Sequence, residues 1–474
     1  MKKSYTETLA DFAAAMSVDD LTEEALCATK RLILDTIGCS VGGYTSTIGK
    51  IVTEIKRELG GRPESTLMVV GDRTSCTSAA YVNAEMAMSM DADDTFTWSG
   101  HHANCAVLPA LAVAERVGAS GKQLVEAVAL GYDIAARIGF SLRLTVADTG
   151  TGTIDYAPTS GMSWIIFGAA VAAGKLLGLD EERMAEAMGL AGFTTSVPII
   201  GKGRGKKRAP RPMTKWALAG TMAESGVMAA LLARKGFTAD RTVLDGEYGF
   251  WRMVGAFSCN WDFLTADLGK RWFIEETSFK PYPCCRFIHA PLDAFYKLLR
   301  ENQLEPEDID QVNVHAFSLL NNFEEPTVRN EVDTQFNVPH VFAMAAFGVA
   351  PGPKWQSPDT WHDPKVEAFK QKVKIHANPA CDASVAKQQM EGVWKRLPAA
   401  VEVKAKGQTF GAEAEYAWGD PWTPDTRMTD DEMKEKFRNM AFGLLRPDRI
   451  EMAIDTIYNL DKIGCVDELV DCLK

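Results

Sequence analysis

The sequence predicts a mainly α-helical protein with a large all-helical domain and a smaller α+β lid domain. Its 474 residues are too many for one compact hydrophobic core. Apolar residues follow helical spacing through residues 1–274 and again through 422–474, whereas segments of alternating polarity are concentrated between 275 and 421. We therefore assign 1–274 with 422–474 to the all-helical domain and 275–421 to the α+β lid domain.

The first half of the chain contains a series of helical segments. The first, 17–43, begins at Ser17 as a predicted N-cap, has an acidic first turn, and ends at Gly42 and Gly43. Four further segments have the same character: 107–120, 121–139, 163–180 and 222–237. The segment 163–180 is apolar almost all round and rich in Ala and Gly, which is typical of a helix in the centre of a helical core.

The region from 275 to 421 contains the predicted strands. Polar and apolar residues alternate in 309–319, 372–379 and 399–419, and these segments contain β-branched residues. Helical segments, 289–302 and 338–350, lie between the strands. In the tail, Thr429 is a predicted N-cap before an acidic first turn, and we expect the tail helices to pack on the first domain.

The composition excludes several classes of protein. The formal net charge is -12, whereas a general nucleic-acid-binding protein has a basic excess. No apolar run approaches the length of a membrane span, and no signal-peptide apolar region follows the N-terminal lysines. Among ten cysteines only Cys284 and Cys285 are close together, and adjacent cysteines do not match zinc-ligand spacing. We expect reduced thiols and a cytoplasmic protein with neither nucleic-acid nor membrane partners.

The stretch MDADDTFTWSGHHANCAVLP, residues 90–109, concentrates ionisable groups before an apolar helix. On a helix, Asp91, Asp94 and Thr95 would share one face because they stand at positions i, i+3 and i+4. The adjacent histidines His101 and His102 follow in a predicted loop. The stretch is therefore either part of a catalytic site or only the polar N-terminus of a helix, with an aspartate as cap and the histidines on the surface.

Two further segments contain chemically useful groups. Residues 201–215, GKGRGKKRAPRPMTK, contain seven Lys or Arg and no acidic residue, so they form a positively charged segment. This segment either attracts an anionic ligand or is only a solvated or RNA-contacting loop. In 278–295, two prolines fix the backbone around Lys280, Cys284, Cys285 and Arg286. This second segment is either part of a ligand cleft at the domain junction or a hinge with packed thiols.

These segments together resemble the MmgE/PrpD family, which includes 2-methylcitrate dehydratase, cis-aconitate decarboxylase and iminodisuccinate epimerase. Six blocks occur in the family's order: LTEEALCATKRLILDTIGCSVGG, DADDTFTWSGHHANCAVLPALAVAE, FGAAVAAGKLLGLDEERMAEAMGLAG, MTKWALAGTMAESGVMAALLARKGFTA, FKPYPCCRFIHAPLDA and MTDDEMKEKF. The resemblance covers nearly the whole chain. It implies a helical domain with a smaller α+β lid, a homodimer, an active site between the domains, and no cofactor.

The resemblance also implies roles for individual residues. The family's aspartate and threonine correspond to Asp91 and Thr95, its histidine to His102 because of the spacing to the Val-Leu-Pro helix start, and its two lysines to Lys215 and Lys280. Two positions depart from the family. Ala157 stands where the family has a histidine, and Cys285 stands where the decarboxylase branch has a histidine and the epimerase branch a cysteine.

The residues and the resemblance predict proton abstraction next to a carboxyl group of a small di- or tricarboxylate. His102 is the predicted base, oriented by Asp91. Lys215 and Lys280 stabilise the developing charge. The predicted substrate-binding residues are Thr95, Arg286, Lys202 and Arg204. Because the sequence contains no HExxH, zinc-ligand or GxGxxG motif, we predict no metal and no cofactor.

The predicted reaction is that of a lyase of the dehydratase type, and alternatives remain open. Decarboxylation is one. Epimerisation is another, in which Cys285 is the second acid–base group, provided that Lys280 and Arg286 lower the pKa of its thiol. A non-catalytic relative with a binding role would explain Ala157, and an RNA- or partner-binding role would explain the basic segment.

Overall fold

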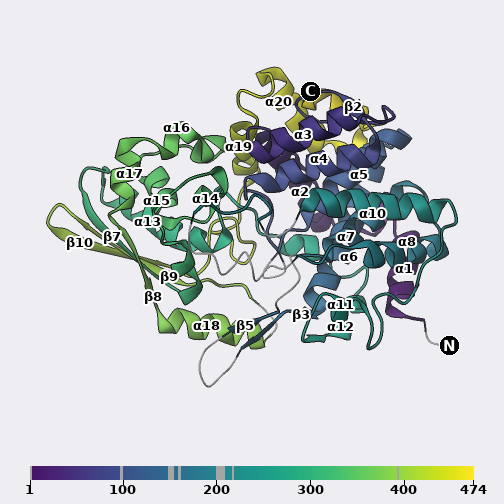
Figure 1. The fold of residues 1–474 in the computed structure, drawn as a ribbon, viewed down its shortest axis with the longest axis horizontal. Coiled ribbons are helices and arrows are strands. Elements are labelled where there is room, and N and C mark those ends of the chain that lie inside the picture. The colour runs from purple at the N-terminus through teal and green to yellow at the C-terminus, as the bar shows by residue number, and fades with distance from the viewer. Residues whose placement is uncertain are drawn as a thin grey trace.

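The structure is a computed structural model that describes residues 3–96, 100–147, 154–157, 162–198, 209–215, 218–391 and 394–474. Lys202 and Arg204 lie outside these ranges. Figure 1 shows a helical part and a part built on one sheet side by side along the long axis of the molecule. The structure is thus mainly α-helical with a smaller α+β part, as the sequence predicts.

The helical part contains helices from both ends of the chain. They are α1 Tyr5–Ala15, α2 Glu23–Gly43, α3 Thr47–Leu59, α4 Cys76–Ser89, α5 Ala103–Val117, α6 Gly121–Ser141, α7 Ile165–Leu176, α8 Glu181–Thr194, α10 Ala219–Arg234, α11 Phe250–Met253, α12 Trp261–Thr265, α19 Asp430–Ala441, α20 Pro447–Tyr458 and α21 Asp467–Val470. The helix predicted from Ser17 begins later, because Thr22 is the N-cap of α2 and Ser17 precedes a single 3-10 turn at Val18–Asp20.

The centre of the helical part is packed with small residues. All but the last two residues of α7 are buried, and α7 packs against α5, α6 and α10. Helices α6 and α7 approach closely at Gly131 and Gly168, where a Cβ on Gly131 would lie 2.7 Å from the Gly168 carbonyl oxygen. The Ala- and Gly-rich sequence therefore permits backbone contact between these two helices.

The other part is built around a four-stranded sheet of order β10-β9-β7-β8. Its strands are β7 Ile309–Ala316, β8 Val373–Ala377, β9 Ala399–Ala405 and β10 Gln408–Ala414. Strands β7 and β8 are parallel, and the β7–β9 and β9–β10 pairs are antiparallel. In β9, Ala399, Val401, Val403 and Ala405 are buried while the intervening residues are partly or fully exposed, which is the alternation that predicts a half-buried strand.

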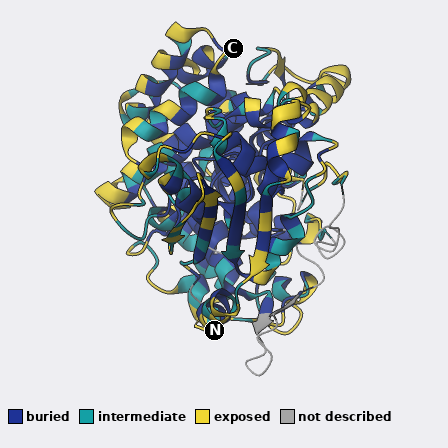
Figure 2. Cartoon of the chain, turned by 90° about the vertical axis from the view of Figure 1, so that its left-hand side faces the viewer, coloured by how far each residue is buried: buried dark blue, intermediate teal, exposed yellow. Residues whose placement is uncertain are grey.

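Helices pack beside this sheet. Those of this part are α13 His289–Glu301, α14 Glu331–Gln335, α15 Val338–Ala346, α16 Pro358–Trp361, α17 Pro364–Lys370 and α18 Pro379–Met390. Helix α13 contacts β9 and β10, and Figure 2 shows the opposite face of the sheet, where exposed and buried positions alternate along the strands. Short two-strand pairs complete the structure: β1 Ser65–Thr66 with β2 Arg73–Thr74, β3 Leu142–Arg143 with β6 Ser258–Cys259, and β4 Thr145–Ala147 with β5 Ile154–Tyr156.

The buried apolar side chains form two clusters. The larger one joins residues from 9 to 279 with residues from 428 to 473, and α19 packs on α2 within it. The smaller one joins Ile48 with residues from 282 to 405. The boundaries at 275 and 421 remain a proposal, since Phe279 packs in the larger cluster. We refer below to the parts on either side of them as the helical domain and the small domain. Within the described ranges, no helix has the length and apolar character needed to cross a bilayer.

Candidate functional site

The segment Asp91–Phe96 forms a tight turn after α4. The prediction that Asp91, Asp94 and Thr95 share a helix face is wrong, because α4 ends at Ser89 and Asp91 adopts a φ of +57°. Asp94 instead accepts hydrogen bonds at the start of α5, from the N–H groups of His102 (3.2 Å) and Ala103 (3.1 Å). An aspartate satisfies helix-start donors well, and this capping contact favours a turn in place of continued helix.

Two buried lysines meet at the Asp91 carboxylate. Lys280 Nζ donates to Oδ2 of Asp91 (3.0 Å) and to its main-chain oxygen (2.9 Å). Lys215 Nζ lies 3.2 Å from Oδ1 of Asp91 and donates to the Met88 carbonyl (2.6 Å). Lys215 adopts a φ of +47°, an uncommon conformation for a residue with a side chain. The structure therefore brings together three of the predicted site residues, Asp91, Lys215 and Lys280.

The charges of these groups stabilise one another. Burial alone would raise the pKa of Asp91, but the Lys280 and Lys215 ammonium groups outweigh it and lower that pKa. Burial alone would lower the pKa of Lys280, but the Asp91 and Asp93 carboxylates raise it. Asp91 and Lys280 are therefore charged at neutral pH despite their burial.

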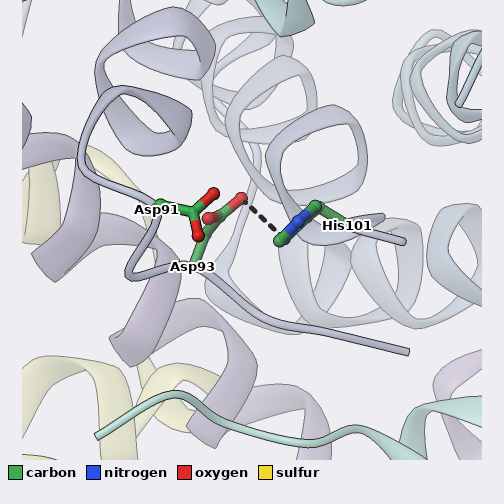
Figure 3. A group of neighbouring side chains, drawn as sticks. All are labelled: Asp91, Asp93 and His101. Atoms are coloured by element: carbon green, nitrogen blue, oxygen red, sulfur yellow. Dashed lines mark ion pairs between the residues drawn. The ribbon is translucent and has the colours of Figure 1, made fainter. Parts of the chain in front are cut away.

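His101 joins this cluster through Asp93. Its Nδ1 lies 3.3 Å from Oδ2 of Asp93 and 2.5 Å from the Asp94 carbonyl oxygen. Figure 3 marks the His101–Asp93 ion pair with a dashed line. Because a carbonyl oxygen only accepts, Nδ1 bears the hydrogen, and in neutral His101 the lone pair is on Nε2. Burial opposes protonation of His101, but the Asp93 carboxylate outweighs it and raises the His101 pKa. Reciprocally, His101 and the two lysines overcome burial and hold the pKa of Asp93 well below its usual range.

Gly100, the residue before His101, fixes the backbone from which the His101 side chain extends. Gly100 has a φ of +101°, which favours glycine, and a Cβ there would lie 2.3 Å from Sδ of Met162. The His101 N–H also contacts this sulfur at 3.2 Å. Residues 97–99 lie outside the described ranges.

His102, the predicted base, points elsewhere. It is fully buried among the rings of Phe96, Tyr132 and Trp164, and its Nε2 accepts a hydrogen bond from the Trp164 indole N–H at 2.9 Å. Burial, with the nearby charge of His101, lowers the pKa of His102 to about 3. The structure thus does not bring His102 to Asp91, and places its neighbour there.

Thr95 lies beside the lysine segment. It pairs with Ser278 as an isolated β-bridge, with N–H···O distances of 2.8 and 2.9 Å. Its hydroxyl Oγ1 is buried and has no hydrogen-bond partner within the described residues. A buried hydroxyl without a partner is costly unless something else satisfies it, which is consistent with a substrate-binding role.

Cys285 and Arg286 lie buried in the segment that follows Lys280. Burial, reinforced by the Asp91 charge, raises the pKa of the Cys285 thiol to about 12 although Lys280 acts to lower it, so the condition set for an acid–base role of Cys285 is not met. Arg286 forms a buried ion pair with Asp420, and its second contact is to the Trp418 carbonyl at 3.4 Å. The desolvation of a thiol at a packed junction exceeds the effect of nearby cations here.

The basic segment is described only at its end. Predicted substrate-binding residues Lys202 and Arg204 fall outside the described residues. Arg211 packs against the rings of Phe323 and Phe336 in the small domain, and its N–H donates to Asp333 at 2.8 Å. Lys215 reaches Asp91, so the described end of this segment runs from the small domain to the carboxylate cluster.

A group that could hold a metal ion coincides with this cluster. One ligand atom each from Asp91, Asp93 and His101 lies within 4.8 Å of the others. Yet both Asp91 oxygens are already close to ammonium groups, and a divalent cation would face the charges of Lys215 and Lys280. The donor set is present, but these lysines oppose its use by a metal.

Several buried groups around the turn have no clear sequence pattern. Lys436 of α19 forms a buried ion pair with Asp35 of α2 and donates to the Ala92 carbonyl at 2.7 Å. Gln335 and Gln356 of the small domain also donate to main-chain oxygens near the turn. Only Asp35 could have been noticed, as a charge within the apolar run LILDTIG. Lys436 and the glutamines stand in ordinary polar surroundings in the sequence.

Comparison with known proteins gives matches along both parts of the chain. The MmgE/PrpD N-terminal domain model matches residues 7–258, and the MmgE/PrpD C-terminal domain model matches residues 282–462. The cis-aconitate decarboxylase of Homo sapiens is 27% identical over 100% of this chain and 95% of the human protein, and that of Mus musculus is 26% identical over 100% and 94%. A cis-aconitate decarboxylase-like protein of Aspergillus oryzae is 24% identical over 98% and 96%.

Proposed function

This chain belongs to the MmgE/PrpD family, and from that premise we propose that it is a cofactor-independent lyase of the dehydratase type that acts on a small di- or tricarboxylate. The observation that most strongly supports the proposal is the meeting of Lys215, Lys280 and the His101–Asp93 pair around Asp91. Such a cluster combines an imidazole base with cations that bind carboxylates.

In this proposal His101, in place of His102, is the general base. Asp93 and the Asp94 carbonyl hold Nδ1, so Nε2 accepts the proton from the carbon next to a substrate carboxylate. The raised pKa of His101 makes it a stronger base than an isolated imidazole. His102 has its Nε2 engaged by Trp164 and a pKa of about 3, and is the weaker candidate.

Lys215 and Lys280 stabilise the charge that develops on the substrate. Each ammonium has three N–H groups, and the described contacts of each are one main-chain oxygen and one oxygen of Asp91. The remaining N–H of each can bind a carboxylate oxygen, where it is most effective as negative charge accumulates. In dehydration the proton goes to His101, the C–O bond breaks, and one ammonium protonates the leaving hydroxyl to give water.

Decarboxylation is the second candidate, because the full-length relatives are named cis-aconitate decarboxylases. Two departures reduce its support: Ala157 is buried and offers no proton, and Cys285 stands where that branch has a histidine. Epimerisation loses support as well, because a thiol with a pKa near 12 is a poor acid–base group at neutral pH.

The test is incubation of the purified chain with a panel of di- and tricarboxylates in D2O, including cis-aconitate and 2-hydroxy tricarboxylates, followed by NMR. Loss of water from a hydroxy acid, or its reverse addition to an alkene, supports the dehydratase proposal. Release of CO2 identifies a decarboxylase, and deuterium exchange with inversion alone identifies an epimerase. The absence of turnover and of binding across the panel would contradict the enzyme proposal and favour a binding role.

A further inference from the structure

Five successive main-chain oxygens at the end of α4 accept hydrogen bonds from side chains of distant residues. The pairs are Met88 with Lys215 (2.6 Å), Ser89 with Gln335 (2.7 Å), Met90 with Gln356 (2.6 Å), Asp91 with Lys280 (2.9 Å) and Ala92 with Lys436 (2.7 Å). The last carbonyls of a helix lack the partners that a further turn would supply, and these side chains act as donors to them. The Met88 carbonyl also accepts a main-chain hydrogen bond, from the Asp91 N–H at 3.3 Å. We call these five donors the carbonyl clamp.

Two donors of the carbonyl clamp are neutral amides of the small domain. Gln335 ends α14 and is fully buried, and Gln356 ends the 3-10 turn Pro353–Gln356 and is 7% exposed. They are linked to each other, because Gln335 Nε2 also donates to Gln356 Oε1 at 2.9 Å. Because an amide is neutral, the two glutamines have no charge–charge attraction to the site. They contribute by fixing the positions of the groups to which they are hydrogen-bonded.

The same two residues also hold the chain segment that follows Lys280. Gln356 Nε2 donates to the Pro283 carbonyl at 3.1 Å, and the Cys285 N–H donates to the Gln335 carbonyl at 2.9 Å. The pair therefore contacts both sides of the site: the end of α4 before Asp91, and the segment after Lys280. A shift of either glutamine would change the separation of Asp91 and Lys280.

We propose that Gln335 and Gln356 are positioning residues that fix the acidic turn against the lysine segment from the small domain. The consequence for catalysis rests on the proposed function, whereas the consequence for geometry does not. Misplacement of catalytic groups by about 1 Å costs on the order of a hundredfold in rate, so modest relaxation of the clamp is enough to reduce turnover.

The test compares Gln335→Met and Gln356→Met with Gln388→Met as the matched control. Methionine has a similar shape but donates no hydrogen bond. Gln388 is a buried glutamine of the same domain that binds the main chain at Lys395 and Arg396, without a described contact to the turn. With a substrate from the panel, we expect kcat to fall about tenfold or more for the two clamp variants and KM to change less than about threefold. The control is expected to keep both constants.

A second measurement is independent of turnover. In protein labelled with 13C-histidine, the His101 resonance titrates with a pKa raised by Asp93. If the turn relaxes, the Asp93 contact weakens, and the His101 pKa moves toward 6.5 by about half a unit or more in the clamp variants but not in the control. If the clamp variants show this pKa shift but the protein turns over no carboxylate of the panel, the positioning role is upheld and the proposed function is contradicted.

The opposite result overturns the inference. If both clamp variants titrate and turn over like Gln388→Met, Gln335 and Gln356 are structural only. Should a methionine variant fail to fold, Gln335→Asn and Gln356→Asn replace it, because asparagine keeps the amide but is one methylene too short. The same two readouts and the same control apply to them.

Discussion

His101 and His102 are adjacent in the chain but have opposite surroundings. His101 faces two carboxylates and has a raised pKa, whereas His102 faces three aromatic rings and has a pKa of about 3. In the sequence, the spacing to Val107-Leu108-Pro109 led to His102 as the predicted base. Spacing alone does not show which of the two histidine side chains points toward the carboxylates. The direction depends on Gly100, whose backbone conformation has no simple sequence pattern.

The first prediction separates the two histidines. His101→Asn is expected to reduce kcat/KM by about a hundredfold or more, because it removes the proposed base. His102→Asn is expected to reduce thermal stability while the folded fraction remains active. Steady-state kinetics and thermal unfolding of both variants check this. The reverse pattern of activity loss would restore His102 as the base.

The second prediction concerns stability against pH at His102. The folded-state pKa of about 3 lies below the unfolded value of 6.5, so only the unfolded chain takes up this proton between pH 6.5 and 3. Its contribution is complete above pH 6.5 and declines as the pH falls, by about 2 kcal/mol at pH 5. Denaturant unfolding at pH 7.5 and 5 should show a smaller loss for His102→Asn than for the parent chain. Equal losses would place His102 in contact with solvent.

The third prediction concerns Cys285. Because its thiol has a pKa near 12, it is protonated at neutral pH and is not needed as a base. Cys285→Ser is therefore expected to keep turnover within about fivefold, on the scale of a packing change and well short of the loss of an acid–base group. A loss of a hundredfold with unchanged substrate binding would revive the epimerase alternative.

At the scale of elements, regular patterns were predictable and the turn was not. Apolar spacing predicted α5, α6, α7 and α10, polarity alternation predicted β7 to β10, and the Thr429 cap appears with its complete capping box to Glu432. The turn after α4 was predicted as helix because Asp91, Asp94 and Thr95 have helical spacing. Asp94 instead caps α5, and the donors that hold the turn come from distant segments that local patterns do not specify.

The fourth prediction tests the contact between α19 and α2. Lys436→Met leaves the Asp35 carboxylate buried without its partner, so we expect a loss of about 3–5 kcal/mol in the free energy of unfolding. Adding Asp35→Leu removes the orphaned charge and should recover much of that loss. Denaturant unfolding of the single and double variants measures this.

A control is available on the same helix. Lys434 pairs with Asp431 on the surface, so Lys434→Met should cost less than about 1 kcal/mol. If Lys436→Met were equally mild, or if the double variant were no more stable than the single one, Asp35 and Lys436 would not depend on each other.

At the scale of the whole molecule, the proposed site combines groups from both domains. The helical domain provides Asp91, Asp93, His101 and Lys215, and the small domain provides Lys280. The sequence identified Asp91, Lys215 and Lys280 through resemblance to the MmgE/PrpD family. It did not reveal the partners Asp93 and Lys436, because their contacts with His101 and Ala92 arise only when the loop and α19 fold against the end of α4.

The fifth prediction concerns metal ions. Both carboxylate oxygens of Asp91 and Oδ2 of Asp93 are already engaged by ammonium, amide and imidazole groups, whereas Oδ1 of Asp93 has no hydrogen-bond partner within the described residues. Extensive dialysis against a chelator is therefore expected to leave activity intact. Activity that is lost on dialysis and returns only when a divalent ion is added would show that the cation displaces the lysines.

The carbonyl clamp has a consequence for how the chain folds. Its donors stand 127, 189, 246, 266 and 344 residues beyond the carbonyls they reach. Closing such long loops is slow in folding, so helix α4 can form early while the acidic turn after it acquires its conformation late. During synthesis on the ribosome, the last donor, Lys436, emerges 344 residues after the carbonyl that it reaches. A nascent chain would therefore have most of its helical core before it has a working site.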